Sequence, residues 1–136
     1  GFNIESLNVA ETNESGISRM TIITRGDDKK IEQITKQLNK LVDVIKVIDL
    51  TEEHFVDREL ILVKMNAEAR VREEILRIVD IFRAKVIDVN HDNYTVEITG
   101  DEGKIKGFLD LLKPLGIKEI VRSGRIAISR GTKSIN

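Results

Sequence analysis

The feature that most constrains the fold of this chain is a short internal repeat. Residues 24–31 read Thr-Arg-Gly-Asp-Asp-Lys-Lys-Ile, and residues 99–105 read Thr-Gly-Asp-Glu-Gly-Lys-Ile. In both segments a threonine ends an alternating apolar stretch, a glycine turns the chain, and acidic residues precede a helical pattern. An aspartate at a helix start accepts hydrogen bonds from free backbone N–H groups. The repeat therefore predicts two copies of one structural unit.

The spacing of apolar residues predicts the elements of each copy, because strands alternate with period two and helices repeat every three to four residues. The predicted strands span residues 2–10, 18–25, 43–50, 59–65, 85–89, 94–99, 117–121 and 125–129. The predicted helices begin at 26–28, span 68–83, and run from 100 to a close at Pro114 and Gly116. The second half therefore reads β-α-β-β-α-β with an extra strand, and the first half reads β-β-α-β.

The sequence also predicts how two of these elements are buried. The unbroken apolar run Leu60–Val63 predicts a central strand that is covered on both faces. The first helix is expected to carry one apolar face, formed by Ile31, Ile34, Leu38 and Leu41. The 20 isoleucines and 12 valines, against four phenylalanines and one tyrosine, also favour sheet.

The order β-α-β-β-α-β is that of the ferredoxin-like fold. The sequence therefore predicts an α+β chain of two tandem ferredoxin-like domains, residues 1–51 and 55–136. The first domain lacks its first strand and helix in this sequence. Because that strand is central in the fold, its absence would leave backbone groups unpaired, and we expect a strand and a helix before Gly1 in the natural protein.

The composition excludes several classes of function. The 22 basic and 23 acidic residues give a net charge of −1, so no global field attracts nucleic acid or an anionic membrane. No cysteine is present, which excludes disulfides, thiolate zinc sites and cysteine nucleophiles. Charged residues interrupt every apolar run before it reaches the ~20 residues of a membrane span.

No pattern in the sequence indicates catalysis or metal binding. His54 and His91 lie in predicted surface links without the spacing of a metal site. The acidic pair Asp27-Asp28 is interpreted as a helix cap. The basic residues near the C-terminus lack the interleaved aromatics of a single-strand binder, and we expect them to discourage sheet aggregation; they are Arg122, Arg125, Arg130 and Lys133.

Asn3, at the start of the first strand, has two interpretations. Its side chain can satisfy a neighbouring turn. It can also donate and accept hydrogen bonds at once, as the ammonium and carboxylate of a zwitterionic ligand require. The residues alone leave both open.

Longer segments resemble a known family. Residues 1–7, 18–22 and 31–44 closely resemble the regulatory (small) subunit of acetohydroxyacid synthase, also called acetolactate synthase. The resemblance continues through Arg58–Leu60, Ile81–Val89 and Arg122–Gly124. It implies an N-terminal ACT domain, which is a ferredoxin-like amino-acid sensor, followed by a second ferredoxin-like domain.

The resemblance also implies a non-catalytic function. Such subunits bind and activate the catalytic (large) subunit of acetolactate synthase and confer feedback inhibition by valine or a related branched-chain amino acid. Thiamine diphosphate, Mg²⁺ and FAD are implied only for that catalytic partner, and no cofactor is implied for this chain. The implied location is the cytoplasm, or an organelle in a eukaryote.

The resemblance further implies self-association through the ACT domains, with the effector at their interface. One wall of that site is Asn3 and Ile4, and Ile4 is expected to offer apolar contact. The opposite wall is a glycine turn after the first strand, in the segment expected before Gly1. Two alternatives are an ACT-type sensor acting on transcription, which needs a DNA-binding element, and a small ferredoxin-like hydrolase, which needs a phosphate cradle. Neither feature is recognisable here.

Overall fold

The computed structural model describes residues 3–51 and 53–135, which form two compact units. Unit 1 comprises Gly1–Asp57 with Arg125–Asn136, and unit 2 comprises Arg58–Gly124. The sequence predicted that the second domain extends over 55–136. In the structure the C-terminal segment groups with unit 1, where the backbone N–H of Arg125 donates to Ser6 Oγ (2.9 Å) and Arg19 Nη2 donates to the carbonyl of Ala127 (2.9 Å).

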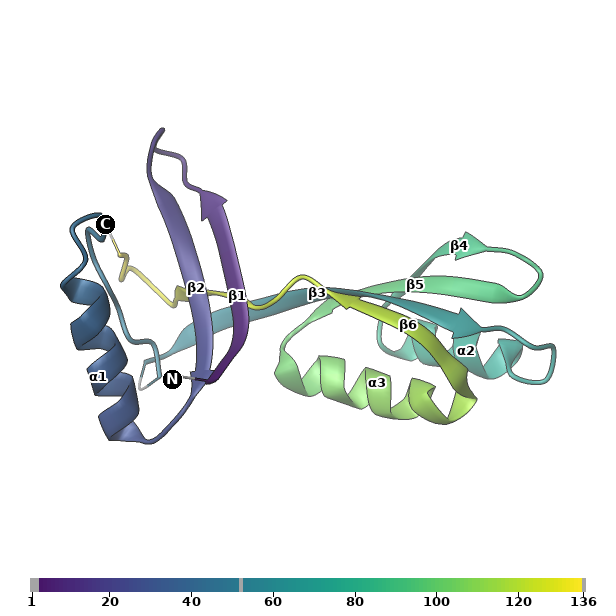
Figure 1. Cartoon of the computed structure of the whole chain (residues 1–136). Coiled ribbons are helices and arrows are strands. Elements are labelled where there is room, and N and C mark those ends of the chain that lie inside the picture. The colour runs from purple at the N-terminus through teal and green to yellow at the C-terminus, as the bar shows by residue number, and fades with distance from the viewer. Residues whose placement is uncertain (1–2, 52, 136) are drawn as a thin grey trace. The chain divides into compact units, whose positions relative to one another are not determined.

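Unit 2 has the predicted β-α-β-β-α-β order (Figure 1). Its elements are β3 (Phe55–Asn66, of which Phe55–Asp57 belong to unit 1), α2 (Arg72–Ile81), β4 (Lys85–Val89), β5 (Asn93–Gly100), α3 (Glu102–Gly116) and β6 (Ile117–Arg122). The strands are ordered β4-β5-β3-β6. This is the strand order of the split βαβ, or ferredoxin-like, fold.

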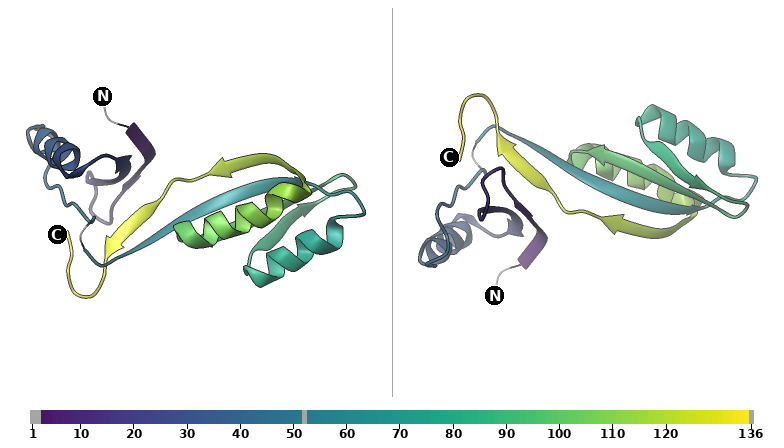
Figure 2. Two further views of the ribbon diagram at one scale, coloured as in Figure 1. Left: turned by 90° about the horizontal axis from the view of Figure 1, so that it is seen from below. Right: turned by 90° about the horizontal axis from the view of Figure 1, so that it is seen from above.

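The core of unit 2 lies between one face of this sheet and the two helices, which cover the same side (Figure 2). Its buried apolar side chains are Ile61, Val63, Met65, Ala67, Val71, Ile75, Ile78, Val79, Val96, Ile98, Ile105, Phe108 and Leu112. The helix α3 continues through Pro114 to Gly116, whose φ of +103° ends it. Pro114 therefore lies inside the last turn, where a missing N–H costs one hydrogen bond without ending the helix.

The expectation that β3 is covered on both faces is wrong. The strand is central, between β5 and β6, as predicted. Its buried residues alternate, however, and Leu60 on the other face is exposed. Both helices lie on one side of the sheet, so only one face of this apolar run is covered.

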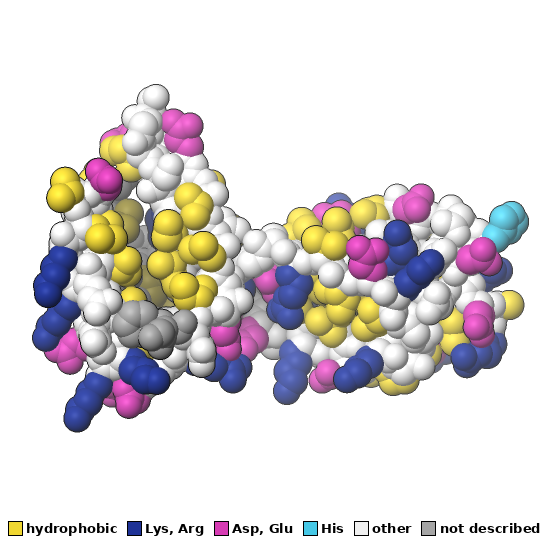
Figure 3. All heavy atoms as spheres, in the orientation of Figure 1, with side chains coloured by type: hydrophobic (Ala, Val, Ile, Leu, Met, Phe, Trp, Pro, Cys, Tyr) yellow, Lys and Arg dark blue, Asp and Glu magenta, His cyan; other side chains and the backbone are white. Residues whose placement is uncertain are grey.

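Unit 1 contains a hairpin of β1 (Asn3–Glu11) and β2 (Ser18–Arg25), the helix α1 (Asp28–Asn39), and β7 (Ile126–Ser129), which pairs with β3. The predicted hairpin and helix are confirmed, although Phe2 lies outside the described residues. Hydrophobic side chains gather over the hairpin in this view (Figure 3). None of the described residues of unit 1 is fully buried.

Two expectations for unit 1 are wrong. Residues 43–50 form no strand, and Leu41 is exposed beyond the end of α1. In the ferredoxin-like order the last strand pairs with the first, and no strand within residues 3–51 occupies the first position. The β-branched residues of 43–50 favour a strand, but a strand forms only where a partner backbone accepts its hydrogen bonds.

The internal repeat is confirmed in atomic detail. Asp27 caps α1 by accepting a hydrogen bond from the N–H of Lys30, and Asp101 caps α3 by accepting one from the N–H of Lys104, both at 2.9 Å. The preceding glycine has the same role in both copies. A Cβ at Gly26 or Gly100 would lie within 3.0 Å of the lysine side chain, so the turn has little room for a larger residue.

Candidate functional site

The predicted effector residues lie at the start of β1, at the open end of the hairpin. The two strands pair antiparallel from Asn3 opposite Arg25 to Glu11 opposite Ser18. A β-bulge interrupts the register between Ile4 and Ser6. The Thr24 hydroxyl donates to the backbone carbonyl of Asn3 at 2.7 Å, which holds the end of β1 against β2.

Asn3 and Ile4 project to opposite faces of the hairpin, because successive residues of a strand alternate. Both side chains are exposed. A ligand beside the Asn3 amide therefore meets Ile4 through its backbone rather than its side chain. The residues opposite in register share the face of each, so Arg25 lies on the face of Asn3 and Thr24 on that of Ile4.

Two charged residues lie near Asn3: Arg25, opposite it on the same face, and Glu5, which the bulge leaves without a partner in the β1–β2 register. Arg25 forms an ion pair with Glu5, and their side chains are 79% and 38% exposed. Ser6 and Ile23, opposite each other after the bulge, lie on the same face. This end of the hairpin therefore presents a cation, an anion, an amide and one half-buried apolar side chain.

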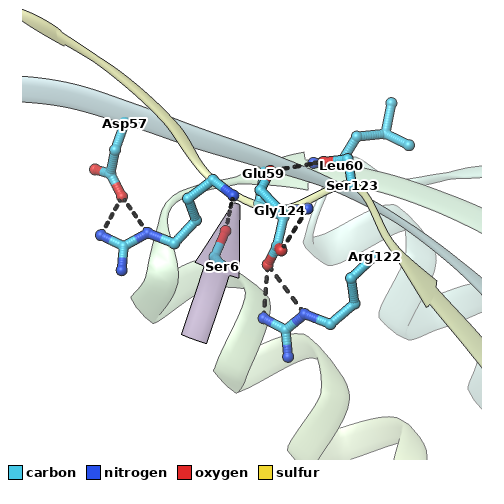
Figure 4. Close-up of polar contacts among 8 residues, drawn as sticks. Ser6, Asp57, Glu59, Leu60, Arg122, Ser123 and Gly124 are labelled. Atoms are coloured by element: carbon cyan, nitrogen blue, oxygen red, sulfur yellow. Dashed lines mark hydrogen bonds and ion pairs between the residues drawn. The ribbon is translucent and has the colours of Figure 1, made fainter. Parts of the chain in front are cut away.

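Further along this face, β1 is attached to the C-terminal segment within unit 1. The N–H of Arg125 donates to Ser6 Oγ (Figure 4). The Arg125 guanidinium donates through Nε and Nη2 to Asp57 Oδ2, at 3.0 and 2.8 Å. Both side chains of this ion pair are largely buried. The C-terminal segment is thereby fixed to both β1 and β3.

A second polar cluster lies in unit 2, around the carboxylate of Glu59 (Figure 4). Arg122 donates through Nη2 (2.6 Å) and Nε (3.2 Å) to one carboxylate oxygen, and the N–H of Gly124 donates to the other at 3.2 Å. Leu60 and Ser123 add two hydrogen bonds, from the Leu60 N–H to Ser123 Oγ and from the Ser123 N–H to the Leu60 carbonyl. These contacts join β3 to the end of β6.

Three of the four basic residues near the C-terminus are partners of acidic groups in the structure, and the fourth donates to a backbone carbonyl. Arg122 pairs with Glu59 and Arg125 with Asp57, while Lys133 pairs with Glu53. Arg130 donates to the carbonyl of Phe55 at 3.3 Å. All four side chains contact β3 or the segment before it, and these contacts hold the C-terminal part of the chain in place.

The two histidines lie in surface links, as the sequence predicts. His54 and His91 are both exposed. Within residues 3–51 and 53–135, no three or more histidine, aspartate or glutamate side chains converge as metal ligands. No helix in those two ranges has the length and apolar character that a membrane crossing requires.

Both parts of the chain match families of known proteins. Residues 58–131 match the family described as the small subunit of acetolactate synthase, and residues 1–46 match the AHAS small subunit-like ACT domain. The chain belongs to the acetolactate synthase small-subunit family. The β-α-β-β-α-β order of unit 2 and the hairpin and helix of unit 1 agree with this membership.

Relatives match the chain over nearly its whole length. The acetolactate synthase small subunit of Aquifex aeolicus is 56% identical over 131 residues, which is 96% of this chain and 68% of that protein. A probable small subunit of Archaeoglobus fulgidus is 50% identical over 98% of this chain and 83% of its own. The crystal structure of the Thermotoga maritima small subunit is 43% identical, with a TM-score of 0.86 over 98% of this chain and 83% of that one.

Arg25, Glu5 and Glu59 were not singled out from the sequence. The hairpin pattern alone indicates which segments pair, but the bulge shifts the register by one residue and decides which side chains face Asn3. Burial distinguishes Glu59 from the other charged residues of β3, which are Asp57, Arg58 and Lys64. A buried carboxylate requires a cation or several hydrogen bonds, and this burial is visible only in the fold.

Proposed function

We propose that this protein is the regulatory subunit of an acetolactate synthase in branched-chain amino-acid synthesis. It binds and activates the catalytic subunit and confers feedback inhibition by valine or a related branched-chain amino acid. The observation that carries this proposal is the pair of family matches, an ACT region followed by the small-subunit domain, in order along the chain. Catalysis, with thiamine diphosphate, Mg²⁺ and FAD, resides on the partner.

The amino-acid effector binds at Asn3 and Ile4, in a site shared by two copies of the chain. The Asn3 amide can donate to a carboxylate and accept from an ammonium. A difference of one methylene in the ligand's side chain is worth only about 1–3 kcal/mol, so related branched-chain amino acids compete for the site. Because the ligand lies between copies, its binding biases their arrangement, and this couples it to the catalytic subunit.

Reconstitution with the catalytic subunit tests the proposal. Acetolactate formation is measured with the catalytic subunit alone, with this protein added, and with valine, leucine or isoleucine at increasing concentration. We expect the protein to raise the rate and one of these amino acids to reverse the increase. If the rate does not change on addition of the protein, the proposal is wrong.

The variant Asn3→Ala separates sensing from activation. It is expected to leave the stimulated rate unchanged and to raise the half-inhibitory concentration of the amino acid about tenfold, because a charge-assisted hydrogen bond is worth roughly 1.5–3 kcal/mol. Asn13→Ala, in the exposed β1–β2 loop, is the matched control and should behave like wild type. Loss of stimulation with unchanged inhibition in Asn3→Ala would exclude the sensing role of this residue.

A further inference from the structure

The ion pair between Arg25 and Glu5 lies beside the predicted effector residue Asn3. Arg25 is directly opposite Asn3 in the β1–β2 register, so their Cβ atoms are separated by about 4.5–5.5 Å and share a face. Glu5 lies two residues beyond Asn3 and contacts the same guanidinium. The Arg25–Glu5 ion pair and the Asn3 side chain therefore lie next to each other at this end of the hairpin.

This combination matches the charges of a free α-amino acid. A guanidinium binds a carboxylate through two parallel N–H groups. A carboxylate or an amide oxygen accepts hydrogen bonds from an ammonium. Ile23, half-buried on the same face, adds an apolar surface for an aliphatic side chain. The arrangement thus complements each part of a branched-chain amino acid.

The ion pair can open at little cost. Its side chains are 79% and 38% exposed, and exposed pairs contribute only about 0–1 kcal/mol. A zwitterion that inserts between the two groups replaces one cation–anion contact by two. The bulge between Ile4 and Ser6 brings an extra residue into this end of β1, and such bulges redirect side chains at functional sites.

We propose that Arg25 and Glu5 form the ionic part of the amino-acid site, with Arg25 binding the α-carboxylate and Glu5 the α-ammonium beside the Asn3 amide. This inference rests on the proposed function, because it assigns further residues to the same effector site. Arg25 sets the requirement for a carboxylate, and Glu5 sets the requirement for an amine.

The test is calorimetric titration of the natural full-length protein with L-valine, L-leucine and L-isoleucine, and with two valine analogues. Isobutylamine lacks the carboxylate, and isovalerate lacks the ammonium. Arg25→Gln should weaken amino-acid binding at least tenfold, from the loss of a charge-assisted contact, and leave isobutylamine binding unchanged. Glu5→Gln should weaken amino-acid binding and leave isovalerate binding unchanged.

Lys36→Gln and Glu32→Gln are matched controls, because these residues form an exposed ion pair in the same unit. Both should bind the amino acid within twofold of wild type. The double variant of Arg25 and Glu5 tests whether Arg25 acts only by neutralising Glu5. Direct contact with the ligand predicts that the double variant binds no better than Arg25→Gln, whereas recovery toward wild-type affinity would refute the proposal.

The outcomes also separate this inference from the proposed function. If wild type binds the amino acid, Asn3→Ala weakens binding and Arg25→Gln stays within twofold of wild type, then the ionic role is wrong and the sensing function stands. If the full-length wild type binds none of the three amino acids, this inference and the sensing part of the proposed function are both wrong. Circular dichroism of each variant establishes that the exposed substitutions leave the fold intact.

Discussion

Replacing Arg122 by methionine removes the cation from a carboxylate that water hardly reaches. The side chain of Glu59 is 5% exposed, whereas that of Arg122 is 53% exposed. Removing one partner of a fully buried ion pair costs about 3–5 kcal/mol, but solvent screens a half-exposed arginine. The charge-assisted hydrogen bonding at one oxygen, worth about 1.5–3 kcal/mol, is lost, while the Gly124 N–H still donates to the other. The free energy of unfolding of unit 2 should fall by about 2 kcal/mol.

Tyrosine fluorescence during urea unfolding measures this loss. Tyr94 is the single tyrosine of the chain and lies in β5, so its emission reports on unit 2. With a slope of about 1 kcal/mol per molar urea, the midpoint should fall by about 2 M. Lys64→Met is the control, because Lys64 pairs with Glu119 at 3.9 Å and both are exposed; its midpoint should stay within about 0.5 M. An Arg122→Met midpoint equally close to wild type would refute the reasoning.

The pH dependence of Arg122→Lys separates charge from packing. The hydrogen bond with Glu59 raises the pKa of Arg122, against an opposing effect of burial. Because the folded pKa exceeds the unfolded one, this stabilisation is complete below the unfolded value and disappears only as pH rises through the folded value, beyond ordinary alkaline conditions. The unperturbed pKa of lysine is about 10.4, so the variant should lose further stability relative to wild type above about pH 10. A difference that stays constant to pH 11 would exclude the charge as its cause.

Three further substitutions test the core and the repeat. Phe108→Ala removes a fully buried ring that packs edge-to-face on Phe82 with centroids 5.4 Å apart. The free energy of unfolding of unit 2, measured by Tyr94 fluorescence, should fall by about 3–5 kcal/mol. A loss below about 1 kcal/mol would show that neighbouring side chains fill the space. Asp27→Ala and Asp101→Ala should each destabilise their helix by about 1 kcal/mol, seen as about fivefold faster hydrogen exchange of the amide that each carboxylate holds. Unequal effects of similar helices would contradict the equivalence of the two copies.

The internal repeat shows how much of the fold is determined by residues that are close together in the sequence. Caps, turns and alternating strands depend on residues within one turn or one ladder step of each other, so the sequence predicts them. Residues 43–50 show the limit, since Val44, Ile45, Val47 and Ile48 favour a strand and none forms. The partner that a strand needs lies elsewhere in the fold, and no local pattern reveals whether it is present.

The candidate site likewise combines residues identified from the sequence with neighbours that only the fold reveals. Asn3 and Ile4 came from family resemblance, and their role as effector residues stays a prediction. The neighbours on the Asn3 face depend on the register at the end of the hairpin, and a bulge changes that register by one residue. The sequence holds both charges of the Arg25–Glu5 pair, but only the pairing of β1 with β2 brings them to Asn3.

The two units differ in how far their apolar side chains are covered. Unit 2 has a closed apolar core, whereas four side chains of the hairpin in unit 1, Ile4, Leu7, Val9 and Met20, are 52–58% exposed. Full burial of such a side chain is worth about 1.5–3 kcal/mol, so covering the exposed half of each yields roughly 4 kcal/mol in total. Whatever covers this surface in the natural protein gains that free energy, which corresponds to about a thousandfold in a two-state equilibrium. The stability of the hairpin therefore depends on what covers it.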